Sequence, residues 1–144
     1  MLIGEFRHTI DSKKRVAIPA KMRKDLGDQA VITRGLDTCL FVYPQEQWAK
    51  LVAKLSDLPM GSGATRSFVR LLLSGASEVE LDQLGRILIP DYLKNYASLQ
   101  KNTVIVGLHT RMELWDPQAW DDYKSKVEHN ADELAERLGN LGVY

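Results

Sequence analysis

Two short segments of the chain share a pattern of charged residues that could bind an anion. Residues 11–19 read Asp-Ser-Lys-Lys-Arg-Val-Ala-Ile-Pro, and residues 82–90 read Asp-Gln-Leu-Gly-Arg-Ile-Leu-Ile-Pro. Asp, Arg, Ile and Pro coincide, whereas ordinary composition gives roughly half a match over nine positions. A guanidinium group can bind a phosphate, or the edge of a guanine through two parallel hydrogen bonds. The doubled pattern therefore predicts two anion-binding turns.

The basic residues of this pattern are the candidates for contact with nucleic acid. Arg15 and Arg86 are the motif arginines, which could reach phosphates or bases. Lys13, Lys14 and Arg7 are expected to attract phosphates, which positions a duplex without reading its sequence. The alternative for each motif is a surface turn whose ion pair has little energetic value.

The acidic residues of the pattern are poor DNA contacts, because like charges repel. Asp11 and Asp82 are instead expected to cap their turns by accepting hydrogen bonds from backbone N–H groups and to orient the motif arginines. Gly85 precedes the second motif arginine and favours a turn with positive φ. The first motif has Lys14 there, which requires either some strain or a different turn type.

The similarity continues beyond the two segments, so the chain is predicted to be one unit written twice. After a two-residue insertion, Val-Ile recurs at 31–32 and 104–105, and Pro-Gln recurs at 44–45 and 117–118. Each Pro-Gln is soon followed by a tryptophan. A unit of this size is marginal alone, and two copies could bury each other's apolar faces.

Four segments of one integrated domain follow from this repeat. They are a first repeat at 1–57, a linker and helix at 58–75, a second repeat at 76–128 and a C-terminal helix or tail at 129–144. Within the second segment, turn-forming residues precede an apolar helix for which Thr65 is the expected N-cap.

Hydrophobic patterning within one copy predicts strands joined by tight turns, with a helix after each proline. The expected order is strand, Asp-x-x-x-Arg turn, strand, short helix, hairpin and longer helix. The predicted fold class is therefore α+β, mainly β, with a pseudo-twofold arrangement of two copies and flanking helices. After Pro117, a single last helix is expected, with an apolar line at Trp120, Tyr123, Val127, Leu134 and Leu138.

The net charge of zero hides a strong asymmetry. Residues 7–34 carry eight basic and three acidic groups, whereas residues 113–144 carry eight acidic and three basic groups. A basic region attracts polyanions and an acidic region repels them, although an uneven solvated surface is also common. We therefore expect the first half to dominate phosphate contact.

At these residues the chain resembles the MraZ family, bacterial regulators of the wider AbrB-like class. The resemblance covers essentially the whole chain. It rests on the doubled Asp-x-x-x-Arg motif, on Leu-Leu-Leu-Ser-Gly-Ala at 71–76 and on Glu-Leu-Trp-Asp at 113–116. The doubled motif in this order is specific, whereas a single copy would carry little information.

The resemblance implies properties that composition and periodicity do not. The two halves would form an AbrB-like swapped-hairpin barrel. The protein would be a transcription factor that binds double-stranded DNA with tandem direct repeats upstream of the division and cell-wall gene cluster. It would associate with the nucleoid and form closed, ring-like homo-oligomers. The family's motif positions correspond to Asp11, Arg15, Asp82 and Arg86.

Other function classes find little support in the sequence. His8, His109, His129 and Cys39 show no metal-ligand spacing, and the Gly-Ser-Gly-Ala-Thr of 61–65 lacks the Lys-Ser/Thr ending of a phosphate-binding loop. We therefore expect no enzymatic activity, cofactor, metal or small-molecule substrate. An enzyme with a cryptic site is the remote alternative.

The expected location is the bacterial cytoplasm. A single cysteine fits a reducing compartment, the first residues lack the apolar run of a signal peptide, and no stretch is apolar enough to span a membrane.

Two questions stay open at this level. An antitoxin-type module with the same fold would block a protein partner, for which an extended tail is typical, whereas residues 129–144 are short and half apolar. The apolar residues 71–73 and the C-terminal apolar line could form interfaces between copies, or could equally pack within one chain.

Overall fold

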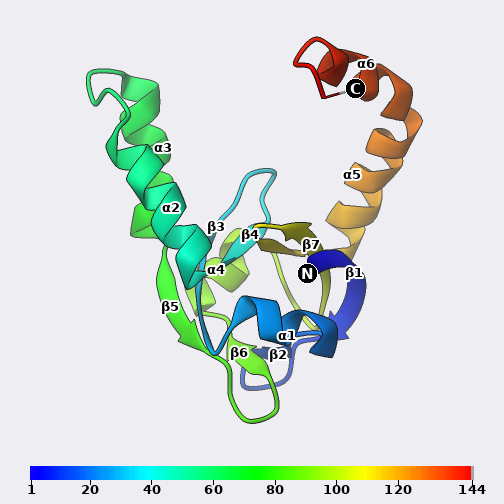
Figure 1. Ribbon diagram of the computed structural model, residues 1–144. Helices are drawn as coiled ribbons and strands as arrows, with labels where there is room; N and C mark the ends of the chain where they lie inside the picture. The colour runs from blue at the N-terminus through cyan, green and yellow to red at the C-terminus, as the bar shows by residue number, and fades with distance from the viewer. Residues whose placement is uncertain (144) are drawn as a thin grey trace.

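The same series of elements, β-β-α-β-β-α-α, occurs twice along the chain. The computed structural model describes residues 1–143 (Figure 1). The strands are β1 (Leu2–Thr9), β2 (Arg15–Ala17), β3 (Gln29–Arg34), β4 (Leu40–Pro44), β5 (Ser77–Glu80), β6 (Arg86–Leu88), β7 (Asn102–His109) and β8 (Met112–Trp115). The helices are α1 (Ala20–Leu26), α2 (Gln45–Ser56), α3 (Gly63–Ser74), α4 (Asp91–Tyr96), α5 (Pro117–His129) and α6 (Ala131–Gly139). The predicted α+β class is therefore confirmed.

The two copies exchange strands instead of forming separate sheets. The six-stranded sheet has the order β1-β7-β8-β4-β3-β5, and β2 pairs with β6 in a second, two-stranded sheet. The counterparts in the two copies are β1 and β5, β3 and β7, and β4 and β8. If each strand is replaced by its counterpart, the same order results, read from the opposite edge of the sheet. All of these pairings are antiparallel. The backbone therefore has the pseudo-twofold arrangement that the repeat predicts.

The register of the strands obeys the same pseudo-twofold relation. Thr9 pairs with Asn102 at the end of β1, and its counterpart Glu80 pairs with Gln29 at the end of β5. A bridge between Ile10 and Val16 joins the end of β1 to β2, but within residues 1–143 the two sheets do not close into the barrel that the resemblance implies.

Apolar side chains on both faces of the six-stranded sheet form two cores. On β4, Leu40 and Val42 belong to one buried cluster, whereas Phe41 and Tyr43 belong to the other, as the alternation of a strand requires. The first cluster also contains residues of β2, β6, α1 and α4, so these elements cover one face. The second cluster receives residues of α2, α3 and α5. Burial of both faces explains why the strands read as continuous apolar runs.

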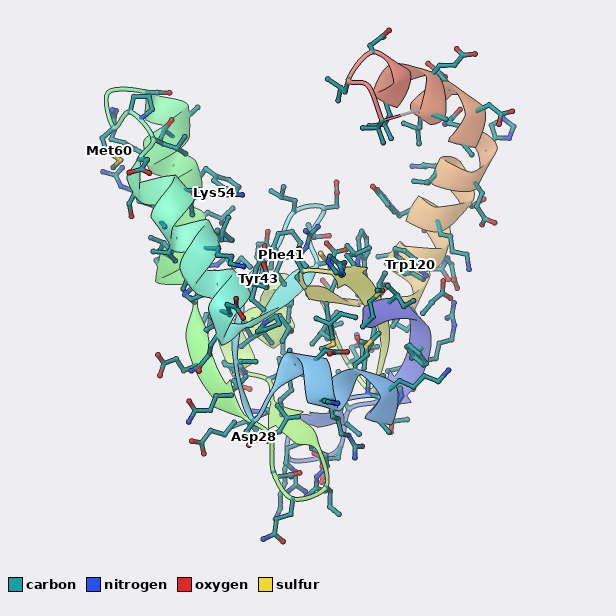
Figure 2. All side chains as sticks on the ribbon, in the orientation of Figure 1. Asp28, Phe41, Tyr43, Lys54, Met60 and Trp120 are labelled. Atoms are coloured by element: carbon teal, nitrogen blue, oxygen red, sulfur yellow. The ribbon has the colours of Figure 1, made fainter. Side chains whose placement is uncertain are left out.

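The long helices extend from the sheet as two arms, α2–α3 and α5–α6, on the side away from β2 and β6 (Figure 1). Phe41, Tyr43 and Trp120 lie where the arms meet the sheet, and Lys54 lies farther out on α2 (Figure 2). The Asp-x-x-x-Arg turns, which precede β2 and β6, are at the opposite end of the molecule. The fold thus separates the charged turns from the apolar arms.

Two sequence predictions about helices were wrong. The N-cap of α3 is Ser62, whose Oγ accepts a hydrogen bond from the backbone N of Thr65, so Thr65 lies within the first turn. The expected single C-terminal helix is two helices, because Asn130 leaves the helical conformation at φ −107° and ψ 15°. Leu134 and Leu138 therefore belong to α6, where 38% and 41% of their surface is exposed.

Candidate nucleic-acid interface

The first Asp-x-x-x-Arg turn is organised by the carboxylate of Asp11. Its Oδ1 accepts hydrogen bonds of 2.9 Å from the backbone N of Lys13 and of Arg15. Its Oδ2 accepts a third, also 2.9 Å long, from Nε of Arg15. The backbone closes the same turn, with Lys14 N donating to Asp11 O at 2.9 Å. Asp11 therefore satisfies the turn and holds the guanidinium of Arg15 in one orientation.

The second turn repeats this geometry. Oδ1 of Asp82 accepts hydrogen bonds of 2.9 Å from the backbone N of Leu84 and of Arg86, and Oδ2 accepts one of 2.8 Å from Nε of Arg86. Gly85 N donates to Asp82 O at 2.9 Å. Two segments with different intervening residues thus form the same turn, with the same hydrogen bonds between Asp and the residues that follow it.

The hydrogen bonds to the two carboxylates also change their acidity. The pKa of Asp11 is lowered, chiefly by the backbone N–H of Arg15 and further by its side chain. The backbone N–H of Arg86 lowers the pKa of Asp82 in the same way. Both effects stabilise the ionised form, because hydrogen bonds to a carboxylate favour its charged state.

The pairing of β2 with β6 places the two turns side by side. Ile18 N donates to Gly85 O, and Ile89 N donates to Lys14 O, each at 2.8 Å, so each strand is bonded to the turn of the other copy. As a result, Nη1 of Arg86 lies 3.9 Å from Oδ2 of Asp11.

The two motif arginines remain accessible in this arrangement. The side chain of Arg15 is 30% exposed and that of Arg86 is 27% exposed. In each case Nε is bonded to the aspartate of the same turn. The structure therefore brings together two oriented, half-exposed guanidinium groups from opposite halves of the chain.

The residue before the motif arginine has the same conformation in both turns. φ is 65° at Lys14 and 73° at Gly85, so Lys14 adopts the left-handed conformation instead of using a different turn type. The two positions differ in their surroundings, because the side chain of Arg23 covers Gly85 in the second turn. A Cβ on Gly85 would lie 2.2 Å from Nε of Arg23, which donates to Ile18 O at 2.8 Å.

The remaining predicted contact residues are placed differently from one another. Lys13 is exposed at the tip of the first turn, and Nζ of Lys14 forms an ion pair with Asp91 at the start of α4. Arg7 lies on β1, where its Nη2 is 2.6 Å from Oδ1 of Asp121 on α5. Its guanidinium is thus joined to α5 and not to the turns, and its role in DNA contact stays a prediction.

Two lysines that the sequence patterns did not single out lie beside the first turn. A groove of about 590 Å³ runs along this turn. Its lining includes Lys94 from α4 and Lys101 from the segment before β7, together with Thr9, Ile10, Asp11, Ser12, Lys14 and Gln100. Both lysines belong to the second copy, so only the pairing between copies brings them here.

The features of other function classes are not found within residues 1–143. In this range no three His, Cys, Asp or Glu side chains gather as they would around a metal ion. Over the same residues, no helix is long and apolar enough to cross a membrane. Cys39 is fully buried in the core beneath the arms, and burial raises the pKa of its thiol. It packs as a small apolar side chain.

Fold and site together define a class of duplicated, mainly antiparallel α+β domains that present paired arginine turns. Comparison with known proteins identifies the family. The family model described as "MraZ protein, putative antitoxin-like" matches residues 1–71 and again residues 72–140. This chain belongs to the MraZ family.

Curated relatives match the chain over nearly its whole length. A protein of Desulforamulus reducens, named Transcriptional regulator MraZ, is 49% identical over 141 residues, which is 98% of this chain and 99% of the relative. One of Natranaerobius thermophilus with the same name is 50% identical over 143 residues, which is 99% of this chain and the whole of the relative. Both relatives are named as regulators and not as enzymes.

Proposed function

We propose that the protein is a transcriptional regulator that binds double-stranded DNA through its two Asp-x-x-x-Arg turns. The observation that carries this proposal is the pair of oriented guanidinium groups of Arg15 and Arg86, set next to each other by the β2–β6 pairing. Guanidinium groups held in a fixed orientation suit both phosphate binding and recognition of guanine. The names of the curated relatives support the same function.

The proposed DNA target consists of tandem direct repeats upstream of the division and cell-wall gene cluster, as the family resemblance implies. A single domain with two turns covers little DNA and would bind it weakly. Several linked copies on repeated sites gain affinity through effective concentration. A ring-like homo-oligomer that acts in the cytoplasm at the nucleoid is therefore part of the proposal, as is an AbrB-like swapped-hairpin relation between the two repeats.

Exposed apolar residues on the arms support self-association. Leu134 and Leu138 on α6, and Met60 between α2 and α3, are 38%, 41% and 54% exposed. These residues lie at the end of the molecule away from the turns (Figures 1 and 2), so a contact between arms would leave the turns free for DNA.

The antitoxin-type alternative finds less support in the structure. An extended tail would be suited to wrapping a toxin, whereas residues 131–139 form the helix α6. The description of the family as antitoxin-like is the observation that favours this second function.

Fluorescence anisotropy of labelled duplexes tests the proposed function. Wild type, Arg15→Ala and Arg86→Ala are titrated against tandem-repeat and shuffled DNA over a salt series. Arg70→Ala, at an exposed position on α3 of the distant arm, is the matched control. If the arginine contacts a base, each motif variant is expected to lose about 1–3 kcal/mol of binding free energy. If it contacts phosphates, the slope of log K against log salt concentration should become shallower by about 0.9 for each phosphate.

Circular dichroism shows whether each variant is folded. Equal binding of tandem and shuffled DNA by wild type, together with unchanged binding by Arg15→Ala, would overturn the proposal and direct attention to a protein partner.

A further inference from the structure

One position beside each turn makes the same backbone hydrogen bond in both copies but carries a side chain of opposite charge. Ile10 N donates to Lys101 O at 2.8 Å beside the first turn. At the equivalent place beside the second turn, Leu81 N donates to Asp28 O at 2.9 Å. The two bonds are counterparts under the pseudo-twofold relation, and the side chains of Lys101 and Asp28 are both exposed. A lysine next to one turn is thus replaced by an aspartate next to the other (Figure 2 labels Asp28).

Neighbouring positions strengthen this difference. Thr9, the last residue of β1, corresponds to Glu80, the last residue of β5, and Lys14 corresponds to Gly85. The second turn therefore has two carboxylates, Asp28 and Glu80, at positions where the first turn has a lysine and a threonine.

The short helices α4 and α1 carry a basic residue at equivalent positions, but the two side chains differ in the bonds that they make. Lys94 of α4 lines the groove beside the first turn. Its counterpart Arg23 on α1 is held over Gly85 by its bond to Ile18 O. The ammonium of Lys94 can thus face a ligand, whereas Nε of Arg23 is already bonded to a backbone oxygen of the protein.

The carboxylates nearest the groove already have partners within the protein. Asp11 accepts hydrogen bonds from the backbone of Lys13 and from the backbone and side chain of Arg15, and Asp91 forms its ion pair with Lys14. Lys94 and Lys101 form no ion pair within residues 1–143. Their charges remain available to an anion that enters the groove.

We infer that this groove binds the phosphate backbone of the DNA contacted by the turns, with Lys94 and Lys101 as its phosphate-binding residues. The inference rests on the proposed function. It assigns backbone binding to the first turn together with residues of the second repeat. At the second turn, which is flanked by Asp28 and Glu80, the DNA contact is assigned to Arg86. The physical reason lies at the equivalent positions Lys101 and Asp28, because a lysine attracts a phosphate there and an aspartate repels it.

The test compares two double variants that remove the same charge. Lys94→Gln with Lys101→Gln removes the groove ammonium groups, and Lys54→Gln with Lys126→Gln removes two exposed ammonium groups from the arms. Both are titrated with tandem-repeat duplex over a salt series, and circular dichroism monitors folding. The groove variant is expected to reduce the salt slope by about 0.9 for each phosphate that is no longer neutralised, and the arm variant to leave it unchanged.

Equal slopes for the groove and arm variants, with Arg15→Ala still defective, would overturn the groove and leave the proposed function intact. Wild-type protein without preference for the repeats would overturn both. If the double groove variant is unfolded, the salt slope of Lys101→Gln alone tests the groove. Lys101 is exposed, and its contribution to the fold is the hydrogen bond that its backbone oxygen accepts.

Discussion

Arg86 from the second half of the chain lies 3.9 Å from the carboxylate of Asp11 in the first half, measured from Nη1 to Oδ2. Its Nε is bonded at the same time to Asp82 of its own turn, at 2.8 Å. The guanidinium of Arg86 is therefore near a carboxylate from each repeat. The two motifs, 71 positions apart in sequence, form one charged surface and not two independent turns.

Substitution of the two left-handed positions should have unequal effects on stability. Gly85→Ala is expected to cost at least about 1–2 kcal/mol, because a Cβ is strained at φ 73° and also meets the guanidinium of Arg23. Lys14→Gly relieves the same strain. It also removes the ion pair with Asp91 and increases the conformational entropy of the unfolded chain. The net change in the free energy of unfolding should therefore stay below about 1 kcal/mol. Denaturant unfolding measures both. Similar losses for the two variants would contradict the packing of Arg23 over Gly85.

Stability in acid should depend on the two motif aspartates. Their pKa values are lowered in the folded protein, so their contribution is present above the unfolded pKa and is lost as pH falls through the folded pKa. The melting temperature should therefore decrease as pH falls below about 4. In Asp11→Asn with Asp82→Asn the decrease should be smaller, because the amide oxygen still accepts hydrogen bonds but does not titrate.

Melting curves at several pH values, monitored by circular dichroism, provide the measurement. Asp132→Asn on α6 is the control, since this residue lies outside the turns. An acid decrease as steep in the motif double variant as in wild type would show that the two carboxylates do not contribute to the fold.

Self-association should depend on α6. Leu134→Glu with Leu138→Glu places charge on the exposed apolar line and should give a smaller assembly, while circular dichroism stays that of a folded protein. Size-exclusion chromatography with light scattering measures the mass. Lys126→Glu on α5 is the control for added negative charge. A mass that is unchanged by the leucine substitutions would place the contact elsewhere.

Local patterns predicted the elements because the information for each element is local. Prolines mark the residue before α1, α2 and α4, and the Asp-x-x-x-Arg spacing matches the hydrogen bonds that close each turn. The repeat also predicted the pseudo-twofold relation. The break at Asn130 was missed because the apolar spacing continues across it.

Partners brought together by long-range pairing could not be predicted in this way. Lys101 reaches the first turn only because β1 pairs with β7, and Arg7 meets Asp121 from a helix that begins after β8. No local spacing connects such residues. Charge alone marked the first half as basic, whereas the structure shows that two lysines of the second half add to the same surface.

The difference in charge between the two turns removes the equivalence that the backbone provides. A truly twofold DNA-binding surface matches a palindromic operator, because a half-turn exchanges identical contacts. Here a half-turn would exchange Lys101 for Asp28, so a groove that binds phosphate as inferred above would favour one orientation of the domain on the duplex over its reverse. Successive copies would then all face the same way along the DNA, a head-to-tail order that a closed ring of subunits also requires.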